Sequence, residues 1–226
     1  MATMLDRISM ATPRADIFVV DDNSTDGTLD VLEAMRRDNL KVLVRPSKLG
    51  LGSAHLLAWN YAIQQGYEAL VTMDGDNSHD PADIPRLLAA LAEGCDLVVG
   101  SRYVAHGICD YTGYRKYVSR IGNSAARTLL PIALSEFTTS FRAFRVVSLK
   151  RINFDTLRGG GYSFFLAVIV QAYMQGLAIT EVPIHFHERN AGTSKIPPLE
   201  IFRGIWNLLR LAAVCRARAL APMLRR

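Results

Sequence analysis

The sequence predicts an α/β protein with an open, mainly parallel sheet and helices on both faces. Short apolar runs alternate with amphipathic segments along the first hundred residues, and several of these runs end in polar clusters. The chain has 226 residues, 50% of them hydrophobic, so it can bury one sizeable core. These observations favour a single domain whose parallel strands are joined by right-handed crossovers.

The expected elements follow in chain order, and their boundaries rest on spacing and on turn residues. Leu29, Leu32 and Met35 repeat at helical spacing in the first of the helices. Gly66 and Gly94 are typical helix ends. The expected strands are 17–20, 40–44, 69–73, 96–99, 141–144 and 178–186, and the expected helices are 28–37, 53–65 (capped by Ser53), 81–93, 115–130 and 164–173.

The strand 69–73 joins an apolar run, expected to be buried on both faces, to a pair of carboxylates. Asp74 and Asp76 follow it directly, while Asp80 and Pro81 have the pattern of a helix cap and first helical residue. The two carboxylates therefore lie at the carboxyl edge of the sheet, where ligands bind in such folds. They can share Mg²⁺ or Mn²⁺ and, through it, a diphosphate. The alternative is a solvated turn, which also favours Asp and Gly.

Other strand ends carry polar residues suited to a nucleotide. Asp21 and Asp22 can accept hydrogen bonds from a base or a ribose, although a helix-capping turn explains them equally. Lys48 and Gly50 precede a helix where backbone can approach a ligand closely. Arg102 places a guanidinium on the same rim, suited to clamping a phosphate.

Composition narrows the partners and the compartment. Lys and Arg exceed Asp and Glu by 26 − 21 = 5, and the excess grows toward the C-terminus. The three cysteines fit no ligand spacing, which favours a reducing compartment. No run is apolar enough to span a membrane. Residues 199–218 form a basic amphipathic helix, suited equally to a lipid surface or to packing on the core.

Six motifs in order resemble the glycosyltransferase family 2, and within it the dolichol-phosphate or polyprenol-phosphate mannose synthases. They are VVDDNSTDGT, KLGLGSA, MDGDNSHDP, VVGSRY, TTSFRAFR and EVPIHFHERNAGTSK. The resemblance implies a GT-A fold over residues 1–197, incomplete at its start. It also implies transfer of mannose from GDP-mannose, with inversion and a divalent metal, to a polyprenyl phosphate. A lipid acceptor then favours a membrane-surface role for the basic helix over residues 198–226. The expected location is the cytoplasmic face of a membrane, without a membrane span and without a nucleic-acid partner.

The resemblance assigns roles residue by residue. Donor contacts fall on Asp21, Asp22, Lys48 and Gly50, and metal ligands on Asp74, Asp76 and Ser78, the last standing where some synthases place glutamine. Arg102, Arg115 and Ser119 match residues that bind the acceptor phosphate. Arg189, Ser194 and Lys195 match a basic loop that closes on the phosphates. Asp76 and Arg102 are the residues expected to be most directly catalytic.

The chain also departs from the family pattern. Glu136 and Ser140 stand where Asp and Gly are usual, and Phe165 and Ala167 replace polar residues. The family opens with a strand that lies centrally in the sheet, whereas residues 4–8 already resemble the end of the helix after it. We therefore expect a gap at the centre of the sheet, and a chain that as given folds poorly or is inactive.

The chemistry leaves several readings open. A phosphate monoester acceptor is already anionic near pH 7, so it needs positioning more than deprotonation. A hydroxyl acceptor would need a general base, for which Glu136 is the candidate. Another donor sugar, a nucleotidyltransferase and an inactive remnant are the competing functions. His185 and His187 share one strand face, but no third ligand is apparent, so no metal is expected there.

Overall fold

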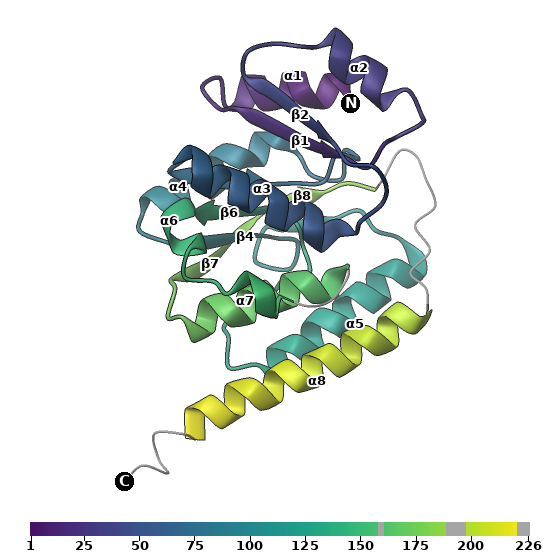
Figure 1. Cartoon of the computed structure of the whole chain (residues 1–226). Helices are drawn as coiled ribbons and strands as arrows, with labels where there is room; N and C mark the ends of the chain where they lie inside the picture. Colours follow the sequence, from purple (N-terminus) through teal and green to yellow (C-terminus); the bar gives the residue numbers. More distant parts are fainter. Residues whose placement is uncertain (158–160, 189–197, 221–226) are drawn as a thin grey trace.

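The computed structural model describes residues 1–157, 161–188 and 198–220 (Figure 1). Its α-helices are α1 (Ala2–Ala11), α2 (Thr28–Ala34), α3 (Leu51–Gln65), α4 (Ile84–Ala92), α5 (Gly113–Leu129), α6 (Val146–Leu149), α7 (Tyr162–Met174) and α8 (Pro198–Leu220). Its strands are β1 (Ile17–Asp21), β2 (Leu40–Val44), β3 (Ala69–Thr72), β4 (Leu97–Ser101), β5 (Ile108–Cys109), β6 (Arg142–Arg145), β7 (Ile179–Pro183) and β8 (His185–Phe186). Two 3₁₀ turns are η1 (Pro81–Asp83) and η2 (Phe154–Thr156).

A four-stranded sheet in the order β3-β6-β4-β7 forms the centre of the molecule. β4 and β7 are parallel, and β6 runs antiparallel between β3 and β4. Successive side chains of a strand point to opposite faces. Accordingly, Leu97 and Val99 join the core cluster with α3 and α7, while Val98 packs on the α4 side. The expected helices on both faces are therefore confirmed.

β1 and β2 form a separate parallel pair, which lies with α1 and α2 at one end of the molecule (Figure 1). No strand among the described residues bridges β1 and β3, so the expected gap at the centre of the sheet is present. β3 is consequently an edge strand. Ala69 is exposed and only Thr72 is buried in it, so the expectation of a strand buried on both faces is wrong.

Three predicted boundaries are corrected by the structure. Ser53 does not cap α3, because the helix starts after Gly50 (φ 92°) and the Ser53 hydroxyl bonds back to the carbonyl of Leu49. The predicted helix 81–93 begins as η1, although Asp80 does cap it, accepting a hydrogen bond from the Ala82 amide at 2.8 Å. The predicted strand 178–186 is divided into β7 and β8, which belong to different sheets.

α8 lies along α5 and α7 at the opposite end of the molecule from α1 (Figure 1). One side of it, with Leu208, Leu211, Ala212 and Cys215, enters the main core cluster. The other side remains exposed, including Phe202 at 70% and Trp206 at 73%. Among the described residues, no helix combines the length and the apolar character that crossing a bilayer requires.

Candidate active site

A cavity of about 440 Å³ opens at the carboxyl ends of β3 and β4. It brings Asp74 and Asp76 of one motif together with Arg102 of another, as the sequence predicts. The remaining lining residues are Leu51, Gly75, His79, Tyr111, Thr138, Thr139, Ser140, Gly161, Phe165 and Phe186. A larger hollow of about 580 Å³ between α2 and β2 contains none of the predicted site residues.

The turn that carries the two aspartates is built by its own side chains. The Asp76 carboxylate accepts a hydrogen bond from the Ser78 amide at 3.0 Å, and Asn77 adopts a left-handed φ of 64°. Ser140 donates its hydroxyl to Asp74 Oδ1 at 2.6 Å. This bond fixes the Asp74 carboxylate against the segment that precedes β6.

His79 is a cavity residue that the sequence reasoning did not single out. Its Nδ1 accepts a hydrogen bond from the Asp74 amide at 3.1 Å, and its ring lies between Phe141 and Phe186. Burial lowers the pKa of His79. The ring is therefore neutral near pH 7 and supports the backbone at Asp74; its place inside the MDGDNSHDP motif was the available signal.

The donor atoms around Asp74 and Asp76 fit a hard divalent cation. Both carboxylates line the same cavity, and the polar side chains beside them, those of Thr139 and Ser140, carry oxygen. Mg²⁺ or Mn²⁺ would be held by these two aspartates. Ser78 does not line the cavity: its side chain is fully buried, and its hydroxyl has no hydrogen-bond partner among the described residues. A ligand role for Ser78 stays a prediction.

Arg102 is held by a buried carboxylate. Its Nε and Nη2 donate to the two oxygens of Glu136 at 2.8 and 2.9 Å, and Nη2 also reaches the Thr138 hydroxyl at 3.3 Å. Its guanidinium lies 4.6 Å from the centre of the Phe186 ring. Nη1 makes no hydrogen bond to a described residue, so it is the guanidinium nitrogen that can donate to a ligand in the cavity.

Glu136 is fully buried, and this bears on its predicted role as a base. Burial by itself would raise its pKa, but the charge of Arg102 and the bonds from Arg102 and Thr138 hold the pKa of Glu136 below its ordinary value. A carboxylate so paired is a poor proton acceptor. The geometry therefore gives Glu136 the role of orienting Arg102 and weakens the case for a hydroxyl acceptor.

Asp21 and Asp22 lie at the end of β1 and do not line the cavity. Asp21 is buried and accepts a hydrogen bond from the Ser24 amide at 2.7 Å, in a local turn that precedes α2. The N-cap of α2 is Gly27, without a side-chain cap bond, so Asp21 does not cap this helix. Arg45 donates its Nε to the Asp22 carboxylate, while its Nη1 reaches the Ser53 hydroxyl at 2.7 Å and its Nη2 reaches the Gly50 carbonyl at 3.3 Å. Arg45 thus ties two predicted donor motifs together.

The other residues predicted to bind substrate either do not line the cavity or lie outside the described residues. Lys48 is exposed and outside the cavity. Ser119 on α5 accepts a hydrogen bond at 2.8 Å from the hydroxyl of Tyr103, the residue that follows Arg102 in the chain. Arg115 lies on α5, but its side chain is outside the described residues, as are Arg189, Ser194 and Lys195.

Comparisons with known proteins show which family the chain resembles. The family described as Glycosyl transferase family 2 matches residues 2–152. The chain is 39% identical over 194 residues to polyprenol monophosphomannose synthase of Mycolicibacterium smegmatis, covering 84% of this chain and 73% of that protein. It is 36% identical over 223 residues to undecaprenyl-phosphate mannosyltransferase of Micrococcus luteus, covering 97% and 91%.

A solved structure supports the fold. Glucosyl-3-phosphoglycerate synthase from Mycobacterium tuberculosis, in complex with Mn²⁺, uridine diphosphate and phosphoglyceric acid, superposes with a TM-score of 0.67. The alignment has 20% identity and covers 93% of this chain and 73% of that one. At this identity the likeness concerns the fold, which is GT-A.

Proposed function

The chain belongs to glycosyltransferase family 2, and on that premise we propose that it transfers mannose from GDP-mannose to a polyprenyl phosphate. The observation that carries the proposal is the meeting of Asp74, Asp76 and Arg102 in one cavity. An acidic pair suits the diphosphate side of a donor through a cation, and an arginine suits an anionic acceptor. The names of the two mannosyltransferase relatives supply the sugar and the lipid class.

The acidic pair serves the leaving group. A divalent cation bound there would supply positive charge to the departing diphosphate. Asp74 and Asp76 themselves orient that charge, because Ser140 and the Ser78 amide hold their carboxylates in place. Such preorganisation lowers the barrier without rearrangement during the reaction.

Arg102 serves the acceptor. Glu136 occupies its Nε and Nη2, so Nη1 is the group assigned to the acceptor phosphate. The phosphate is already ionised near pH 7 and attacks the anomeric carbon with inversion, so the residues need only position it. The pairing of Glu136 agrees with an acceptor that requires no general base.

The activity assay uses labelled GDP-mannose, a polyprenyl phosphate and Mg²⁺ or Mn²⁺, with lipid-extractable sugar as the readout. The Asp76→Asn variant keeps the acceptor for the Ser78 amide but removes the charge, so we expect a loss of about 10²-fold or more in kcat/KM. Chelator should abolish the wild-type activity. Full activity of D76N in chelator would refute the proposal, and activity only with UDP-glucose would reassign the donor.

A membrane-facing surface fits a lipid acceptor. Exposed apolar side chains repeat at helical spacing on two neighbouring helices: Tyr114, Tyr117 and Ile121 on α5, and Phe202, Ile205, Trp206 and Leu209 on α8. The exposed Arg120, Arg216 and Arg218 on the same helices suit anionic lipid headgroups. We place the enzyme at the cytoplasmic face of a membrane, which the three free cysteines favour.

Liposome flotation tests this surface. The double variant F202S/W206S should bind anionic vesicles at least about tenfold more weakly, because each apolar side chain contributes roughly 1.5–3 kcal/mol when buried. The control is Met10→Ser, which removes an 81% exposed apolar side chain from α1 at the other end of the molecule. Equal flotation of both variants would exclude α8 as the docking surface.

A further inference from the structure

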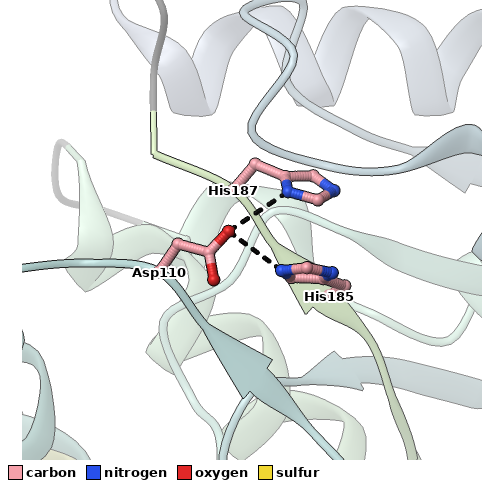
Figure 2. A group of neighbouring side chains, drawn as sticks. All are labelled: Asp110, His185 and His187. Carbon is pink, nitrogen blue, oxygen red and sulfur yellow. Dashed lines mark hydrogen bonds and ion pairs between the residues drawn. The ribbon is translucent and has the colours of Figure 1, made fainter.

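Three side chains that could bind a metal meet on the outer face of β8, away from the cavity (Figure 2). The meeting follows from strand register. β5 and β8 are parallel, with Ile108 opposite His185 and Cys109 opposite Phe186. The next position pairs Asp110 with His187, so His185, His187 and Asp110 share one face because side chains alternate.

The same alternation points Phe186 the other way. It is 4% exposed and lines the candidate active site, whereas the side chains of His185, His187 and Asp110 are 39%, 34% and 40% exposed. One short strand therefore presents Phe186 to the cavity and both histidines to solvent.

The distances suit a shared cation. Asp110 Oδ2 lies 2.9 Å from His185 Nε2 and 3.2 Å from His187 Nδ1, drawn as dashed lines in Figure 2. One ligand atom from each residue lies within 4.8 Å of the other two. Ligand atoms on a tetrahedral zinc ion are about 3.3 Å apart, given metal–ligand bonds near 2.0 Å. Small side-chain rotations would close the remaining difference.

The surroundings also resemble a supported metal ligand. His187 Nε2, the ring nitrogen that does not face Asp110, lies 3.7 Å from Asp80 Oδ2. Histidine ligands commonly direct their second nitrogen at a carboxylate, which orients the ring. Asp80 is in turn held by the Ala82 amide at 2.8 Å and by Arg7 at 2.5 Å.

We propose that Asp110, His185 and His187 form a second metal site, for a divalent transition metal of the Zn²⁺ class. Two imidazoles and one carboxylate favour Zn²⁺, Ni²⁺ or Cu²⁺ over Mg²⁺, whereas the Asp74 and Asp76 pair offers only oxygen. With three protein ligands the fourth position belongs to water. The ion would fasten β8 to the end of β5 and so hold Phe186 in the cavity wall.

Zinc binding to the untagged protein tests this site directly. The chelator-stripped protein is titrated with ZnCl₂ against a chromophoric chelator, with millimolar Mg²⁺ present to occupy the oxygen-only site. Wild type and D76N should each bind one Zn²⁺ at this site. H185N/H187N and the single variant D110N remove ligands themselves, so each should weaken zinc binding by more than the roughly 10- to 100-fold that loss of a supporting outer residue costs. The matched control is His106→Asn, which removes an exposed histidine whose left-handed φ of 67° asparagine tolerates.

Circular dichroism establishes that each variant is folded, and the visible absorption of Co²⁺ added to wild type reports the coordination without any substitution. Unchanged zinc affinity in both H185N/H187N and D110N would overturn the proposal. So would loss of the zinc in D76N, because the ion would then belong to the cavity. Absence of zinc binding to wild type would also overturn the proposal and leave the three residues as a hydrogen-bonded cluster only. None of these outcomes depends on glycosyl transfer.

Discussion

Removing the charge of Glu136 should destabilise the protein strongly. The fully buried carboxylate accepts four hydrogen bonds, two from Arg102 at 2.8 and 2.9 Å and two from Thr138 at 3.1 and 2.7 Å. In Glu136→Gln the amide nitrogen faces a guanidinium donor, and Arg102 is left buried without a counter-charge. One charge-assisted bond, worth about 1.5–3 kcal/mol, is lost outright and the other loses its charge, so we expect the roughly 3–5 kcal/mol typical of breaking a buried ion pair.

Urea unfolding followed by circular dichroism measures this effect. We expect the midpoint to fall with the m-value unchanged, and a melting temperature lower by roughly 6 to 20 °C for a domain of this size. Glu93→Gln, at the exposed end of α4, is the matched control and should stay within about 0.5 kcal/mol of wild type. A loss below about 1 kcal/mol in E136Q would refute the reasoning.

Two further measurements separate the ion pair from mere packing. Replacing both partners with apolar residues, as in R102M/E136L, should cost less stability than E136Q alone, because no buried charge remains. The pH dependence has a definite sign. Since Arg102 holds the pKa of Glu136 below its ordinary value, its contribution is complete above about pH 4.3 and is lost as pH falls through the folded-state pKa.

Three other predictions follow from single positions. Burial lowers the pKa of His55 to about 4, so the free energy of unfolding should decrease by up to about 3 kcal/mol between pH 6.5 and 4, and His55→Phe should flatten that slope in urea titrations. Gly107→Ala would put a Cβ 2.7 Å from the backbone of residues 101–102, so it should lower the free energy of unfolding by roughly 1–3 kcal/mol. The control Gly122→Ala has open space on α5 and should be neutral or stabilising. Equal melting temperatures of the two variants would contradict this prediction. Arg45→Met should raise the donor KM at least about tenfold by releasing the Asp22 and Gly50 motifs, and an unchanged KM would remove Arg45 from the donor site.

Local sequence determined the identity of most elements and the polar residues at their ends. The strand 40–44 was predicted to the residue, and the helix end at Gly66 follows from a left-handed φ of 73° that glycine adopts readily. The Asp74 and Asp76 turn was predicted because a short apolar run followed by carboxylates is a local pattern. Periodicity and turn chemistry act over a few residues, and a sequence displays them directly.

Tertiary structure decided which of these residues lie in contact, and it set their hydrogen-bond partners and the direction of their pKa shifts. Arg102 was predicted to face a ligand, but Glu136, 34 positions away, takes two of its nitrogens. His185 and His187 appeared to have no third ligand because Asp110 reaches them only through the β5–β8 register, 75 positions along the chain. Burial and charge pairing depend on contacts between distant segments, so the pKa of Glu136 and the joining of the strand ends into one cavity are properties of the folded chain.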